Sequence, residues 1–171
     1  MYISFPPIRN KSKLFAKQLS HILIKAKWYV ATAESCTGGW ISKTMTDIPG
    51  SSNWFSNGLI SYSNLSKINL LELSEKLIDD EGVVSEPVVK AMAKNVLRIS
   101  KVDISVAVSG IAGPGGGTDK KPVGTVCFGW ATKNNFLSET CYFSGNRDSI
   151  RSASVERALY GLIQIANLES Q

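Results

Sequence analysis

The 171-residue sequence has few of the side chains on which metal centres and disulfide frameworks depend. It contains one histidine, His21, and three widely spaced cysteines, Cys36, Cys127 and Cys141. None of these has the CxxC or Cys/His spacing of a structural zinc site, and three cysteines do not suit a disulfide framework. We therefore expect reduced thiols, a cytoplasmic location, no metal and no other cofactor.

Long apolar segments and dense runs of charge are also missing. No stretch reaches the roughly 20 apolar residues that a membrane-spanning helix needs, and the first residues lack the basic and apolar regions of a secretory signal. The net charge is +5, but no run of five or more basic residues occurs. These absences argue against a membrane protein and against nucleic acid as the main partner. The positive charge suits attraction of a small anionic substrate.

The order of apolar patterns predicts the fold class. Helices are expected at about 12–26, 37–46, 65–71, 73–79, 86–100 and 147–166. Strands are expected at about 28–33, 57–62, 102–108, 123–131 and 136–143. Asn64 and Ser85 are expected to cap the helices that follow them. The first half alternates helix and strand, whereas the last two strands predict a hairpin. This order predicts an α/β fold, a three-layer α/β/α sandwich with a mixed β-sheet, as a single domain over residues 1–171.

A turn rich in hydroxyls and glycine follows the first expected strand. The apolar run at 29–32 meets Glu34, Ser35, Cys36, Thr37, Gly38 and Gly39, and a helical pattern comes next. Such a turn directs free backbone N–H groups, and the positive end of a helix dipole, at a bound anion. The alternative is an ordinary turn in which the glycines serve only tight packing.

A second loop of this kind follows the apolar run at 104–108. Residues 110–117 contain five glycines and one proline, so they cannot form the interior of a helix or strand. The loop matches neither the GxGxxG fingerprint nor the P-loop, so neither nucleotide-binding motif applies. Because both loops follow buried-type strands, we expect them to share one small-molecule site.

Lys67 is the candidate general base. A Ser-His-Asp triad would depend on His21, remote from both loops, and lysine is the usual substitute base for a serine. Lys67 follows a buried-type strand and lies one turn inside an expected helix, where the dipole and apolar neighbours lower the pKa of an amine. Its expected partner is Ser51 or Ser52. The alternative is an exposed helix lysine.

Six segments in order resemble a known family. They are 33–39 (AESCTGG), 47–52 (DIPGSS), 62–64 (YSN) with Lys67, 84–86 (VSE), 109–114 (SGIAGP) and 121–126 (KPVGTV). Together they resemble the C-terminal domain family of the competence/damage-inducible protein CinA, over residues 15–165. Because the sequence has no counterpart of the N-terminal domain of full-length CinA, it resembles the single-domain form.

What this resemblance implies is an amidohydrolase that converts nicotinamide mononucleotide (NMN) to nicotinate mononucleotide and ammonia without a metal. It implies a Ser-Lys mechanism with Ser52 as nucleophile, Lys67 as base, and Tyr62 keeping Lys67 neutral or relaying the proton. Ser51 and Ser35 remain alternatives to Ser52. The expected substrate-binding residues are Ser35, Thr37, Gly38, Gly39, Ser109, Gly110, Gly113 and Arg147. The phosphate is expected to contact residues 37–39 and Arg147. Without the resemblance, Arg147 would be interpreted as a surface arginine.

Gly115 departs from the family pattern, in which an acidic residue usually follows the Gly-Pro pair. If that acid orients the substrate, this chain would have weak or altered activity. The alternative function is therefore a catalytically weak or inactive nucleotide-binding or interaction module of the same fold. The resemblance also implies a homo-oligomer.

Overall fold

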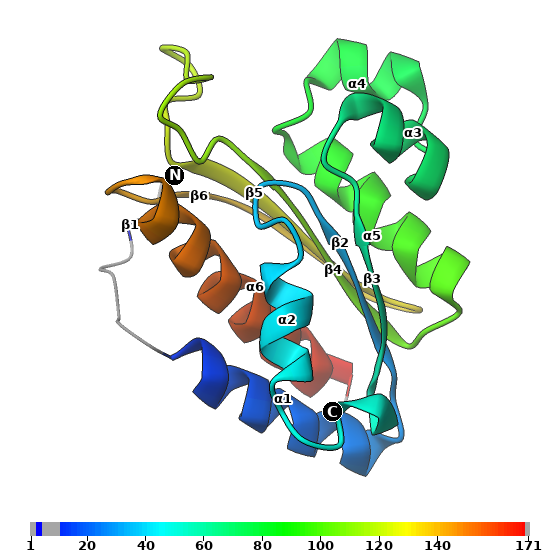
Figure 1. Cartoon of the computed structure of the whole chain (residues 1–171). Helices are drawn as coiled ribbons and strands as arrows, with labels where there is room; N and C mark the ends of the chain where they lie inside the picture. Colours follow the sequence, from blue (N-terminus) through cyan, green and yellow to red (C-terminus); the bar gives the residue numbers. More distant parts are fainter. Residues whose placement is uncertain (1–2, 5–10, 170–171) are drawn as a thin grey trace.

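Six strands form one mixed sheet in the computed structural model, which describes residues 3–4 and 11–169 (Figure 1). The strands are β1 (Ile3–Ser4), β2 (Val30–Glu34), β3 (Phe55–Ile60), β4 (Ile104–Gly110), β5 (Thr125–Thr132) and β6 (Phe136–Tyr142). Their order across the sheet is β1-β6-β5-β4-β2-β3. Strand β2 is parallel to both β3 and β4, whereas β5 is antiparallel to β4 and to β6. The predicted mixed sheet and its final hairpin are confirmed.

Helices cover both faces of this sheet. They are α1 (Ser12–Ala26), α2 (Trp40–Thr46), the 3-10 helix η1 (Ser51–Asn53), α3 (Asn64–Leu71), α4 (Glu75–Glu81), α5 (Glu86–Ser100) and α6 (Arg147–Glu169). Apolar residues of α1, α2 and α6 form one core with the sheet, and those of α3, α4 and α5 form a second core on the opposite face. The predicted three-layer α/β/α sandwich is therefore confirmed.

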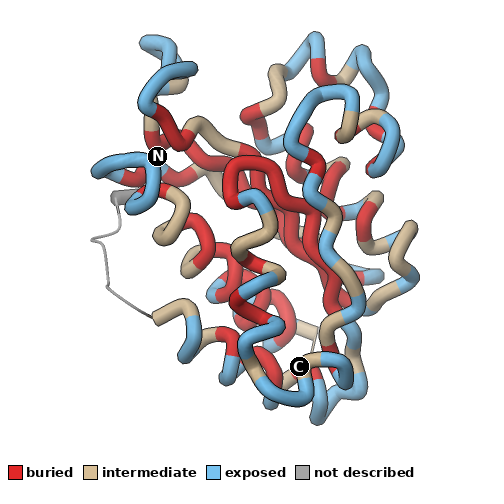
Figure 2. The backbone as a smooth tube through the Cα atoms, viewed as in Figure 1, coloured by how far each residue is buried: buried red, intermediate tan, exposed pale blue. Residues whose placement is uncertain are grey.

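The direction of the side chains alternates along each strand, which explains how one sheet contributes to two cores. In β2, Val30 belongs to the core with α1 and α6, and Ala31 belongs to the core with α5, because successive side chains point to opposite faces. Every residue of β2 and β5 is buried, and Figure 2 shows these strands as a buried layer between helices with exposed outer surfaces.

Two details differ from the sequence-based expectation. The N-cap of α3 is Ser63 rather than Asn64, since Ser63 Oγ accepts a hydrogen bond from the Ser66 N–H at 3.0 Å. The sequence does not predict η1 or the two-residue strand β1. Ser85 caps α5 as expected.

Within residues 3–4 and 11–169, no helix has the length and hydropathy to span a bilayer.

Candidate active site

The carboxyl ends of β2, β3 and β4 meet at one edge of the sheet, because these three strands are parallel. Their ladder continues one residue further: the Ser61 N–H donates to the Glu34 carbonyl at 2.9 Å, and the Ser35 N–H to the Val108 carbonyl at 3.1 Å. Ser61, Ser35 and Ser109 therefore form a row across the three strands. Residues in one row point to the same face of a sheet, here the face covered by α3 and α5.

Lys67 of α3 contacts the middle serine of this row. Its Nζ atom lies 3.2 Å from Ser35 Oγ, 2.9 Å from the Ser61 carbonyl oxygen and 3.2 Å from the Tyr62 carbonyl oxygen. The residue is 1% exposed, and burial lowers the pKa of its amine from the ordinary value of 10.5. In the neutral amine, the two N–H groups can donate to the two carbonyls, which leaves the lone pair for the Ser35 hydroxyl. This arrangement can take a proton from Ser35.

Ser52, expected to be the partner of Lys67, lies at the other end of β3. It belongs to η1, which precedes β3, whereas Lys67 belongs to α3, which follows β3 (Figure 1). A strand of six residues separates the two by roughly 16 Å, at about 3.3 Å per residue. The prediction of a Ser52–Lys67 pair is therefore wrong, and the same distance excludes Ser51. Ser35, the remaining alternative, makes the contact.

The N-terminus of α2, expected to bind the substrate phosphate, is occupied by a carboxylate of the protein itself. Glu34 is fully buried. Its carboxylate accepts six hydrogen bonds, from the N–H groups of Gly39, Ile41 and Ser42 and from the hydroxyls of Thr32, Thr37 and Ser42. Gly38 and Gly39 have φ of +60° and +93°, which glycine adopts readily, so they shape this turn. The N–H groups of Gly39, Ile41 and Ser42 are thus engaged by an internal anion and are not free donors for the phosphate expected against Thr37, Gly38 and Gly39.

Two arginines on α6, four residues apart, contact the loops at this edge. Arg147 donates to the Gly113 carbonyl at 2.8 Å and to the Tyr62 hydroxyl at 3.0 Å. Arg151 donates to the carbonyls of the two residues after Ser35, at 3.0 and 2.9 Å. The Tyr62 phenol thus contacts Arg147, and only the Tyr62 carbonyl contacts Lys67. A proton relay through the phenol, one of the roles expected for Tyr62, would need a contact with Lys67 that the structure does not show.

The other residues predicted in the second loop have packing roles in the structure. The buried Ser109 hydroxyl donates to the Val83 carbonyl at 2.7 Å. A Cβ atom on Gly110 would lie 2.7 Å from the Val126 side chain, so close packing of β4 on β5 requires glycine there. A Cβ atom on Gly115 would meet nothing within 4 Å. The acidic residue usual at that position in the family would therefore fit without a steric clash.

Cys36 is not a competing nucleophile. Its side chain belongs to the core on the opposite face of the sheet from Lys67, and burial raises the pKa of its thiol to about 12. The thiol is therefore protonated at neutral pH, whereas a nucleophilic cysteine is a thiolate.

The backbone N–H groups of Cys36 and Thr37 donate to no other residue that the structure describes. Because they directly follow Ser35, they are candidate donors to an oxyanion.

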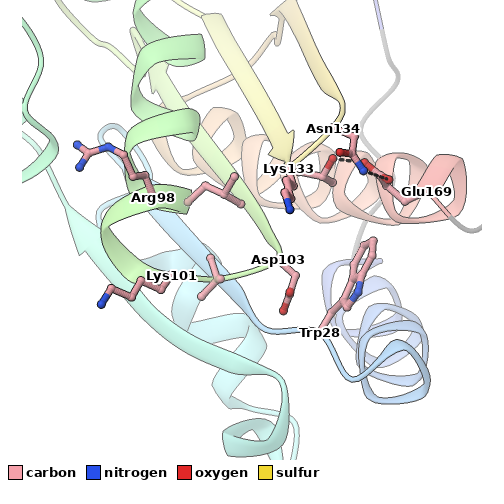
Figure 3. A pocket seen from close by; sticks show the side chains of 10 residues that line it. Trp28, Arg98, Lys101, Asp103, Lys133, Asn134 and Glu169 are labelled. Carbon is pink, nitrogen blue, oxygen red and sulfur yellow. Dashed lines mark hydrogen bonds between the residues drawn. The ribbon is translucent and has the colours of Figure 1, made fainter.

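A separate pocket of about 440 Å³ lies at the amino end of β4 (Figure 3). Both of its carboxylates are engaged with the protein: Asp103 accepts from the Tyr29 N–H, and Glu169 accepts from Asn134. Lys67 and Ser35 lie at the opposite, carboxyl end of the parallel strands. This pocket is therefore not part of the serine-lysine site.

Glu34 and Arg151 are absent from the residues predicted from the sequence, although both carry a signal there. Glu34 ends an apolar strand, and a carboxylate at a buried position needs several donors. Arg151 follows Arg147 by four residues, which places both on one face of a helix.

The fold and the site define a three-layer α/β/α protein with a buried serine-lysine pair at the carboxyl edge of its parallel strands. The family model described as the CinA C-terminal domain matches residues 12–166, and the chain belongs to this family. The resemblance seen in the six sequence segments is thus confirmed.

Individual relatives agree with this assignment. The nicotinamide-nucleotide amidohydrolase PncC of Escherichia coli (strain K12) is 47% identical over 136 residues, which cover 79% of this chain and 82% of the relative. A putative competence-damage inducible protein of Symbiobacterium thermophilum is 44% identical over 150 residues, 82% of this chain. The chain spans only 35% of that longer relative. The crystal structure of the competence/damage inducible protein CihA from Agrobacterium tumefaciens has a TM-score of 0.89 and 36% identity, and the match covers 98% of this chain and 99% of that one.

Proposed function

We propose that this chain is an amidohydrolase that converts NMN to nicotinate mononucleotide and ammonia, in pyridine nucleotide salvage. The observation that carries the proposal is the buried contact of Lys67 Nζ with Ser35 Oγ, beside two carbonyls that can accept the N–H groups of the amine. The substrate follows from the amidohydrolase from E. coli, which is 47% identical. A cytoplasmic location and a homo-oligomer stay predictions.

The first half of the proposed reaction forms an acyl-enzyme. Ser35 Oγ attacks the carboxamide carbon while its proton passes to Lys67 Nζ. The N–H groups of Cys36 and Thr37 donate to the oxyanion that forms on the carboxamide oxygen. The carbon–nitrogen bond then breaks, Lys67 returns the proton to the departing nitrogen, and ammonia leaves.

The second half hydrolyses this ester. A water molecule gives a proton to Lys67 Nζ while its oxygen bonds to the ester carbon. The bond between that carbon and Ser35 Oγ breaks, and Lys67 returns the proton to Ser35. The product is the carboxylic acid, and the enzyme is back in its starting state.

The proposal is tested by incubating the purified protein with NMN, and one ammonia per NMN consumed should be released. Because the proposed proton transfers use only Ser35 and Lys67, the rate should be unchanged after exhaustive chelation with EDTA. Loss of activity on chelation, restored by zinc or manganese, would replace this mechanism by a metal-activated water. NMN binding without ammonia release would support the alternative of a nucleotide-binding module.

We assign the substrate phosphate to Arg147, because Glu34 occupies the N-terminus of α2. Arg147 is exposed beside the Gly113 loop, and its guanidinium has five N–H donors, of which the protein engages only some. Arg147→Ala should lower kcat/KM for NMN by about 10- to 100-fold, the effect of losing charge-assisted hydrogen bonds of about 1.5–3 kcal/mol. Ammonia release from nicotinamide riboside, which has no phosphate, should change less than about threefold.

Arg98→Ala is the matched control, because Arg98 pairs with Glu72 on the outer surface of the protein. It should leave both substrates unaffected. An equal loss of activity on NMN and on the riboside in Arg147→Ala would mean that Arg147 only holds Tyr62 and Gly113 in place, and would overturn the phosphate assignment.

A further inference from the structure

Ser61 carries a buried hydroxyl without a hydrogen-bond partner. The residue is 0% exposed, and Ser61 Oγ has no partner among the residues that the structure describes. Buried polar side chains in native proteins are nearly always paired, and an unpaired one calls for an explanation. An unpaired group beside a reaction centre is available to a reactant.

The position of Ser61 places this hydroxyl beside the serine-lysine pair. Ser61 and Ser35 are neighbours in the row that crosses β3 and β2, where adjacent strands lie about 4.8 Å apart. Both side chains point to the face covered by α3. Lys67 Nζ contacts Ser35 Oγ and also the Ser61 carbonyl. The Ser61 side chain therefore shares the surroundings of the reacting groups.

Other buried serines on this face of the sheet are satisfied by the protein. The Ser105 hydroxyl donates to the Ala93 carbonyl at 2.8 Å, and the Ser109 hydroxyl donates to the Val83 carbonyl at 2.7 Å. Both acceptors belong to α5 or to the loop before it. Ser61 has no such acceptor, so its hydroxyl is unpaired beside the serine-lysine pair.

We propose that Ser61 binds the water that hydrolyses the acyl-enzyme, an inference that rests on the proposed function. In the resting enzyme, the Ser35 hydroxyl faces the lone pair of Lys67, so the first attack needs no group besides these two. After ammonia leaves, Ser35 Oγ is an ester oxygen and has no proton to give. The proton must come from a water molecule, and a buried water needs two or more polar partners.

Lys67 Nζ and Ser61 Oγ are these two partners. One O–H of the water donates to the lone pair of Lys67, and the other O–H donates to Ser61 Oγ. The water oxygen then faces the ester on Ser35, which is the geometry that attack requires. Ser61 therefore acts on hydrolysis of the ester and has no part in its formation.

The test uses Ser61→Ala and measures the two halves of the reaction separately. In rapid-quench experiments with NMN, the variant should release one ammonia per active site in a burst. Steady turnover should then be about 10- to 100-fold slower than in the wild type, the effect of losing one hydrogen bond to a reacting group. The acyl-enzyme should be visible by intact-protein mass spectrometry.

Hydroxylamine distinguishes water binding by Ser61 from a merely structural role. A structural role would leave the ratio of hydroxamate to acid unchanged. It can attack the ester without the water site, so the ratio of hydroxamate to acid should be several-fold higher in Ser61→Ala than in the wild type. Ser61→Thr keeps the hydroxyl and should give the wild-type ratio. If Ser61→Ala fails to fold, Ser61→Cys is measured in its place, because a thiol is a weak hydrogen-bond acceptor of similar size.

Ser105→Ala is the matched control, since it also removes a buried serine hydroxyl from this face of the sheet but lies away from Lys67. It should show neither a burst nor a changed ratio. Equal slowing of ammonia and acid release in Ser61→Ala, without a burst, would overturn the water-binding role and leave the proposed function standing. A wild-type protein that releases no ammonia would overturn both.

Discussion

Ser35→Ala should abolish ammonia release from NMN while the fold and NMN binding are kept. Ser35 Oγ is the hydroxyl that contacts the Lys67 amine, so the substitution removes the atom that attacks the carboxamide in the proposed mechanism. Loss of a nucleophile that acts together with its base lowers kcat by at least about 1000-fold. NMN affinity, measured by calorimetry, should stay within about tenfold of the wild-type value, because the substitution removes the attacking atom and keeps the groups that bind NMN.

Ser52→Ala separates this assignment from the one made on the sequence. Ser52 is exposed in η1, at the opposite end of β3 from Lys67, so its substitution should change kcat by less than about twofold. Both variants should unfold at the wild-type temperature within a few degrees, which excludes misfolding as the cause of inactivity. A dead Ser52→Ala together with an active Ser35→Ala would refute the Ser35–Lys67 pair.

The layers of the fold could be predicted because they depend on short-range patterns. The apolar spacing of α5, its Ser85 cap and the first-turn proline define one helix without reference to any other element. The runs of small and β-branched residues in β2 and β4 define strands buried on both faces. From such elements, the alternation of helix and strand leads to the three-layer sandwich.

The serine partner of Lys67 could not be chosen by closeness in the sequence. Ser52 is closer to Lys67 along the chain than Ser35 is, but β3 stands between Ser52 and Lys67. In parallel strands, residues that follow a strand gather at one edge of the sheet, and residues that precede a strand gather at the other edge. Ser35 follows β2 and Lys67 follows β3, so both reach the carboxyl edge, whereas Ser52 precedes β3.

The expectation for the phosphate depended on a different feature, the free N–H groups at the start of α2. The N-terminus of α2 does direct N–H groups toward an anion, those of Gly39, Ile41 and Ser42. That anion is the Glu34 carboxylate, whose side chain folds back onto the helix that follows it. Residue types alone do not determine which acceptor binds such a group of donors, because this depends on side-chain direction. The structure shows that the Glu34 carboxylate is this acceptor, which is why we propose Arg147 as the cation for the substrate phosphate.

Lys67→Met should also abolish ammonia release, because it removes the only base that contacts Ser35 among the described residues. The expected loss in kcat is again at least about 1000-fold, and it should persist at every pH. Lys67→Arg should be equally inactive, since a guanidinium stays protonated and cannot accept the serine proton. Lys76→Met is the matched control, because Lys76 is an exposed lysine paired with Asp80 on α4.

The pH dependence of the wild type follows from the same amine. Burial lowers the pKa of Lys67, and only the neutral form accepts a proton, so kcat/KM should rise with pH and level off above an inflection below 10.5.

The free energy of unfolding should also depend on pH through Lys67. Between the lowered pKa in the folded protein and the ordinary value in the unfolded chain, the unfolded chain binds more protons at Lys67. The contribution of Lys67 to the free energy of unfolding should therefore rise with pH across that window, and Lys67→Met should lack this rise in urea titrations. A kcat/KM that does not change with pH between about 6 and 10.5, or a rise in stability that survives in Lys67→Met, would contradict a neutral, buried Lys67 as the base.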